Sequence, residues 1–120
     1  MLALAVESLE LALLSSAPVL ASGGCDRAPT PVADCRSVHG RLSVTSGTPS
    51  VRIWPVGTTQ LLGVSGPEEH PFIPDNLMSK LNLSDDIFGD FVVCPLTRER
   101  PGEMQLVCVQ SASELVIRAR

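Results

Sequence analysis

The chain has 120 residues, carries a formal net charge of −4 and contains only 3% aromatic residues. This length fits a single domain. Proteins that bind nucleic acids need a basic surface to neutralise phosphates, and an acidic chain without a basic cluster argues against such a partner. The scarcity of aromatic side chains also argues against a broad stacking surface for bases or sugars.

Residues 1–21 are predicted to be a removable, signal-peptide-like leader. The apolar run Leu11–Ala21 has the length of the hydrophobic region of a signal peptide and is too short to span a bilayer. Small residues follow, so we expect cleavage after Ala21 and export to the periplasm or the cell exterior. Glu7 and Glu10 stand where a usual leader is basic, and an amphipathic N-terminal helix is the alternative.

Residues 22–35 are predicted to be a linker, because they are rich in Gly, Pro and Ser and lack a hydrophobic period. Pro29 and Pro31 exclude a helix and favour extended, solvated backbone. Cys25 stands where a lipidated cysteine would follow a lipoprotein leader, although Ser22 replaces the aliphatic residue expected three positions earlier. We expect contact with a membrane only if Cys25 is lipidated.

Residues 36–120 are predicted to form a small β domain. Apolar and polar residues alternate from Ser37 to Thr45, as in a half-buried strand. Similar patterns predict further strands at 51–54, 60–65, 87–94 and 104–110, a break at 111–113, a last extended segment at 115–118, and a short helix at 76–81.

The order of these elements predicts the fold class. Five strands with a helix between the third and the fourth is the order of an OB-type barrel. We therefore predict an all-β fold with one short helix, arranged as a small five-stranded antiparallel barrel or roll that is OB-like. An open β-sandwich is the alternative.

The four cysteines are predicted to form two disulfides. Cys94 and Cys108 lie on consecutive antiparallel strands and are expected to pair across them, which leaves Cys25 to pair with Cys35. Four cysteines allow three connectivities, and the sequence does not decide among them. The gaps are too long for the C-x₂₋₄-C spacing of zinc sites, so we expect no metal and an oxidising compartment.

No catalytic centre is predicted. The chain lacks the G-x-S-x-G, H-E-x-x-H, P-loop and dinucleotide-binding patterns, so we expect neither an enzyme nor a cofactor. His39 is expected on the outward face of the first strand. His70 lies in a proline-rich loop beside Glu68 and Glu69, where it is expected to be a surface residue.

Trp54 is the candidate centre of a binding surface. It is expected either to cover the barrel or to form a ligand-stacking surface with Arg41 and Arg52. The two arginines should lie on neighbouring strands, on the face opposite Val51 and Ile53.

Two runs of the sequence resemble a family of small exported bacterial proteins. They are HGRLSVTSGTPSVRIWPVGT (residues 39–58) and DDIFGDFVVCPLTRERPGEMQLVCV (residues 85–109), of which RIWPVGT is the most specific part. The resemblance covers residues 35–118. It implies export and a compact domain with cysteines, and it implies no activity and no catalytic residue.

The predicted function is therefore a structural or interaction role, without catalysis, in the periplasm or cell envelope, with an envelope protein or a small ligand as partner. The alternative is an OB-like module that binds an envelope saccharide or peptide through Arg41, Arg52 and Trp54.

Overall fold

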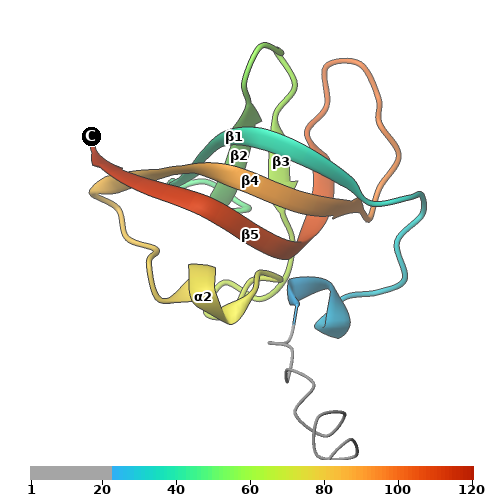
Figure 1. Ribbon diagram of the computed structural model, residues 1–120. Coiled ribbons are helices and arrows are strands. Elements are labelled where there is room, and N and C mark those ends of the chain that lie inside the picture. The colour runs from blue at the N-terminus through green and yellow to red at the C-terminus, as the bar shows by residue number, and fades with distance from the viewer. Residues whose placement is uncertain (1–22) are drawn as a thin grey trace, which may run out of the picture.

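The protein folds as a small all-β domain with one short α-helix (Figure 1). The computed structural model describes residues 23–120, so the leader predicted at residues 1–21 lies outside the described residues. The elements in chain order are the 3₁₀-helix η1 (Gly24–Arg27), β1 (Arg36–Val44), β2 (Val51–Pro55), β3 (Leu62–Val64), α2 (Asp75–Met78), β4 (Asp85–Pro95) and β5 (Gln105–Ala119).

The five strands close into a ring in the order β1-β2-β3-β5-β4, in which β4 pairs again with β1. This confirms the predicted five-stranded barrel, with α2 between the third and fourth strands as in an OB-type fold. All pairs are antiparallel except β3 with β5. A ring with an odd number of strands cannot alternate direction all the way round, so one parallel pair is unavoidable.

The core fills the ring with the inward residues of every strand. Leu42, Ile53 and Phe91 are fully buried, as the alternation of the sequence predicted. Each such side chain stabilises the fold by about 1.5–3 kcal/mol. Ile73 and Leu77, from the segment between β3 and β4, are also buried and join the same cluster.

Two predicted element boundaries were wrong. The segment at 111–113 was expected to break the last strand, but Ser111 and Ser113 stay paired with β4, and β5 runs on to Ala119. A bulge at Glu114, whose φ is 55°, absorbs the irregularity instead. The helix begins at Asp75 and ends at Met78, three residues earlier than the sequence indicated.

All four cysteines form disulfides, as predicted, but the expected pairing was wrong. Cys25 bonds Cys108, and Cys35 bonds Cys94. Cys94 and Cys108 are opposite each other on β4 and β5, as expected. Each is nevertheless bonded to a cysteine of residues 23–35, because that segment packs over both strands. Two disulfides fit an oxidising, extracellular environment.

Residues 23–35, here called the N-terminal strap, were expected to be a solvated linker. The strap is instead attached to the barrel by a disulfide at Cys25 and another at Cys35. Gly24 is buried, and a Cβ there would collide with the carbonyl oxygen of Val109. Arg27 donates hydrogen bonds to three backbone carbonyls of the segment that follows β3. The strap is thus part of the folded domain.

No helix within residues 23–120 is both long enough and apolar enough to cross a membrane.

Candidate binding face of the barrel

Four side chains stand in one row across the outside of the barrel. Arg41 of β1 is the cross-strand partner of Trp54 on β2 and of Phe88 on β4, and Phe88 is the partner of Val116 on β5. Each has a sequence neighbour that belongs to the core cluster or packs against it, so these four point outward; the neighbours are Leu42, Ile53, Ile87 and Leu115. We call Trp54, Arg41, Phe88 and Val116 the outer row.

The guanidinium of Arg41 lies over the indole of Trp54, with 4.6 Å between Cζ and the ring centroid. Its Nη1 also donates a hydrogen bond to Asp86 Oδ2 at 3.4 Å. A cation–π contact of this kind contributes about 0.5–1 kcal/mol at an exposed site. The two side chains therefore hold each other in a fixed arrangement on a rigid sheet.

Asp86 anchors this arrangement from the next row. The hydroxyl of Ser43 donates to one carboxylate oxygen, and Arg120 Nε donates to the same oxygen at 2.7 Å. The Asp86 side chain is only 14% exposed. Burial raises the pKa of Asp86, but the hydrogen bonds from Ser43, Arg120 and Arg41 together with the charge of Arg120 outweigh burial, so its pKa is lowered. Asp86 is thus a fixed anion at neutral pH.

On its other side the outer row is flanked by a hydrogen-bonded pair. His39 Nδ1 lies 2.7 Å from Asp90 Oδ1, and these residues are cross-strand partners on β1 and β4. Their side chains are 62% and 42% exposed. This pair is therefore open to solvent and forms part of a polar rim.

A shallow hollow of about 550 Å³ opens beside the row on the β4–β5 side. Phe88 and Val116 supply its apolar surface, and Val116 is 47% exposed. Its other lining residues are His39, Asp86, Glu114, Arg118 and Ala119. We call this the outer hollow. Its shape and chemistry suit an apolar side chain surrounded by polar contacts.

The structure brings two of the three predicted binding residues together. Arg41 and Trp54 are in contact, whereas Arg52 points toward the β1–β2 turn, where its Nε donates to the carbonyl of Pro49 at 3.0 Å. Sequence reasoning missed Phe88 and Val116. The alternation of β4 placed Phe88 on the outer face. Phe88 lies beside Arg41 only because β1 pairs with β4, and this pairing comes from closure of the ring.

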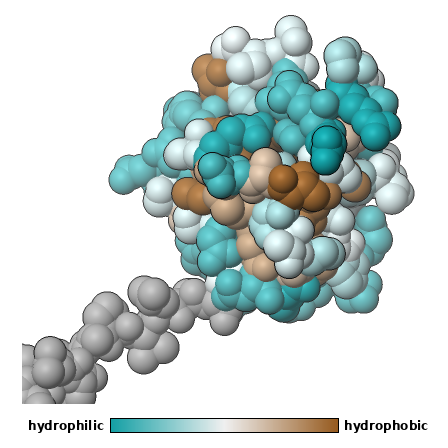
Figure 2. All heavy atoms as spheres, turned by 90° about the vertical axis from the view of Figure 1, so that its right-hand side faces the viewer, coloured by the Kyte–Doolittle hydropathy of each residue, from teal (hydrophilic) through white to brown (hydrophobic). Residues whose placement is uncertain are grey.

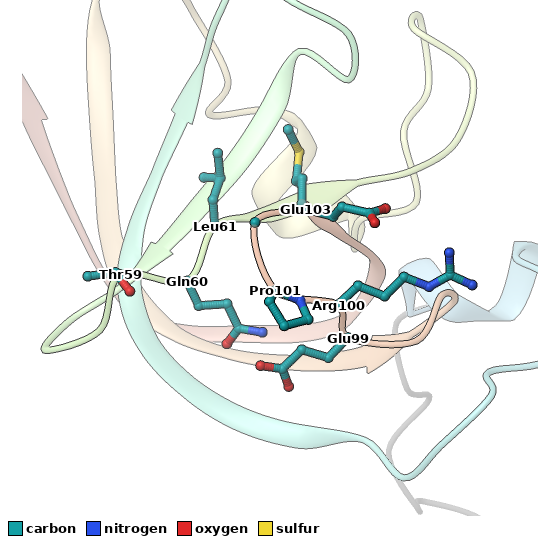
Figure 3. Close-up of a pocket in the computed structure, with 9 residues that line it drawn as sticks. Thr59, Gln60, Leu61, Glu99, Arg100, Pro101 and Glu103 are labelled. Atoms are coloured by element: carbon teal, nitrogen blue, oxygen red, sulfur yellow. The ribbon is translucent and has the colours of Figure 1, made fainter.

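A second hollow lies at the loop end of the barrel, between residues 59–61 and the β4–β5 hairpin tip at 99–104 (Figure 3). It has a volume of about 470 Å³. In Figure 3 the Arg100 and Glu103 side chains extend away from the 59–61 segment. Gln60 is held in place because Arg36 and Gln60 both donate hydrogen bonds to Gln105, which is nearly buried. We call this the loop hollow.

Figure 2 views the molecule from the side on which the strap and the hairpin tip lie in Figure 1. That face is mostly hydrophilic, with a small hydrophobic area near its centre. It lacks a broad apolar surface, whereas the outer row combines aromatic, aliphatic and charged side chains.

The sulfur atoms of Cys25, Cys94 and Cys108 lie within 4.8 Å of one another. Each is bonded in a disulfide, so none is free to bind a metal ion.

No protein-family model, curated protein or solved structure matches the chain. The resemblance to a family of small exported bacterial proteins therefore stays a prediction.

Proposed function

We propose that the protein is an exported, non-enzymatic interaction protein of the cell envelope that binds a partner polypeptide through the outer row. The observation that carries this proposal is the side-by-side placement of Trp54, Arg41 and Phe88 on three adjacent strands. Tryptophan and arginine are the residue types that most often dominate the energy of protein–protein interfaces.

The chemistry of the surface defines the partner. An apolar side chain of the partner would cover Phe88 and Val116 in the outer hollow and exclude water there. A partner carboxylate would pair with Arg118, which makes no ion pair with any residue in the described part of the chain. We therefore infer a peptide segment that combines an apolar anchor with an acidic residue.

Binding rather than catalysis is supported by the state of the acidic groups. Asp86 is occupied by three hydrogen-bond donors, so its carboxylate has little capacity left for a substrate. Asp90 and His39 are paired in a solvent-exposed position. Acid–base catalysts are usually placed where water is excluded and their pKa values are tuned to the reaction.

Export is supported by the two disulfides and by the apolar run that precedes the strap. The test is the intact mass of the protein from its native host, with alkylation before and after reduction. We expect a chain cleaved after Ala21 that shows alkylatable thiols only after reduction. A full-length chain with free thiols would contradict export.

The test of the binding surface is selection of peptides from a displayed random library on the oxidised protein. Affinities of the selected peptides are then measured by calorimetry for the wild type, Trp54→Ala and Phe88→Ala. Loss of a central interface residue of this type costs about 2 kcal/mol or more, which weakens binding about 30-fold. Val32→Ala is the control, since Val32 is an exposed apolar residue of the strap, away from the outer row. Unchanged affinity in both aromatic variants would contradict the proposal.

The loop hollow supports a second candidate function, binding of an envelope saccharide. Gln60, Glu99 and Arg100 supply planar polar groups there, and OB-type folds bind oligosaccharides beside the loop that joins the fourth and fifth strands. Binding on a glycan array that is lost in Gln60→Ala and Glu99→Ala but kept in Trp54→Ala would favour this candidate. Glycan binding that is absent, or is lost only in Trp54→Ala, would dismiss it.

A further inference from the structure

The C-terminal half of β5 has an unpaired edge. β5 pairs with β4 along most of its length, but with β3 only over Gln105–Val107. Beyond that, Val109 donates to the carbonyl of Phe72, and Asn76 donates to the carbonyl of Ala112. Within the described residues, no backbone partner covers this side of residues 113–119. Figure 1 shows this half of β5 paired only on the side of β4.

The backbone groups that face this edge follow from the antiparallel pattern. The N–H of Arg120 donates to the carbonyl of Ser84, on the side of β4. Because hydrogen-bonding direction alternates along a strand, Leu115, Ile117 and Ala119 direct their N–H and C=O groups toward the free edge. The bulge at Glu114 ends the regular edge at Leu115. Free donors and acceptors in a regular strand are a template for another strand.

The side chains of this segment are complementary to themselves. In an antiparallel alignment of two copies about Val116, Leu115 of one copy lies opposite Ile117 of the other. Glu114, at the bulge that ends the regular edge, comes next to Arg118 of the other copy. Val116 then meets its own counterpart. Val116 and Ile117 are 47% and 48% exposed. Glu114 and Arg118 make no ion pairs with other described residues. Every position of the alignment thus joins an apolar pair or opposite charges.

We propose that the protein forms a two-fold dimer in which the β5 edges of two copies pair antiparallel, centred on Val116. Leu115 of each copy exchanges backbone hydrogen bonds with Ile117 of the other. The contact is isologous and therefore closes at two copies. It joins β2–β1–β4–β5 of both copies into one continuous sheet. The two outer rows then lie on the same sheet surface. Because Glu114 of the other copy pairs with Arg118 in this dimer, the acidic residue of a partner peptide would compete with the dimer contact for Arg118.

The experiment is sedimentation velocity of the full oxidised chain over a series of concentrations. The variants are Glu114→Arg, Arg118→Glu and the double exchange of both. Glu99→Arg makes the same charge change as Glu114→Arg, but at the exposed hairpin tip, and is its control. Circular dichroism verifies that each variant is folded.

We expect the wild type and Glu99→Arg to dimerise with the same affinity. Each single edge variant places like charges opposite each other at both ends of the contact and should weaken dimerisation about tenfold or more. The double exchange restores opposite charges and should restore dimerisation. An equimolar mixture of Glu114→Arg and Arg118→Glu should also dimerise, because each copy supplies the charge that the other needs.

A wild type that stays monomeric at every concentration would overturn the proposal. Dimerisation that is equally strong in both single variants would place the contact elsewhere and would also overturn it. The same holds if the mixture of the two single variants fails to associate, since only an intermolecular pairing of positions 114 and 118 predicts that rescue.

Discussion

The disulfide connectivity allows a quantitative prediction for removal of one bond, tested with the double variant Cys25→Ala/Cys108→Ala. The Cys25–Cys108 bond spans 83 residues, and the Cys35–Cys94 bond spans 59 residues inside it. Alone, each would stabilise by about 4–5 kcal/mol in the chain-entropy model. Because the inner bond already shortens the path between Cys25 and Cys108 to about 25 residues, removal of the outer bond should cost about 3.5 kcal/mol.

The assay is urea unfolding followed by the fluorescence of Trp54, the only tryptophan of the chain. Cys25→Ala/Cys108→Ala should lower the free energy of unfolding by this amount and raise the denaturant slope, because its unfolded state is more expanded. It should carry no free thiol, since Cys35 and Cys94 remain bonded.

The contrasting variant is Cys94→Ala/Cys108→Ala, which removes one partner of each bond. It should lose about twice as much stability, roughly 8 kcal/mol, and should not fold stably if the wild type has less than that to lose. If Cys94 were instead bonded to Cys108, this variant would keep a Cys25–Cys35 bond and be the milder of the two. Equal or smaller destabilisation in Cys94→Ala/Cys108→Ala would refute the connectivity.

Three further predictions concern the site and the core. Asp86→Asn should lower stability by about 1–2 kcal/mol at neutral pH. Since the folded pKa of Asp86 lies below its ordinary value of 3.8, the stability that Asp86 contributes is present above that pH and is lost as the pH falls through the folded pKa. In the acid range, the free energy of unfolding should therefore change less with pH in Asp86→Asn than in the wild type. Phe91→Ala should cost about 3–5 kcal/mol, because Phe91 is fully buried, whereas Phe88→Ala should cost roughly 1 kcal/mol; equal costs in chemical denaturation would contradict the assigned faces of β4. Gly24→Ala should destabilise by about 1–3 kcal/mol through its clash with Val109, and thermal melts that match wild type would show that the strap does not pack as described.

The fold was largely predictable because alternation of apolar residues is a local signal. Leu42, Ile53 and Phe91 could each be assigned to the core from their neighbours in sequence. The disulfide pairing was not predictable in this way. Cys94 and Cys108 are neighbours across β4 and β5, as expected, but their bonding partners come from the strap, whose path over the strands depends on tertiary packing.

The candidate site shows the same division between local and long-range information. Arg41 and Trp54 lie on strands joined by a short turn, so their proximity could be predicted from alternation and the turn. Phe88 is far from Arg41 in sequence, and only the pairing of β1 with β4 places it beside them. The lone tryptophan therefore indicated this face from the sequence, but Phe88 and Val116 could be assigned to it only from the strand pairing in the closed ring.

The most direct test of the proposed function is a titration of the isotope-labelled, oxidised protein with a selected peptide, followed by the backbone amide signals in nuclear magnetic resonance spectra. We expect the perturbed amides to cluster at Arg41, Trp54, Phe88 and Val116 on the four adjacent strands. Perturbations confined to residues 59–61 and 99–104 would place binding in the loop hollow, and would contradict the assignment of the outer row as the binding surface.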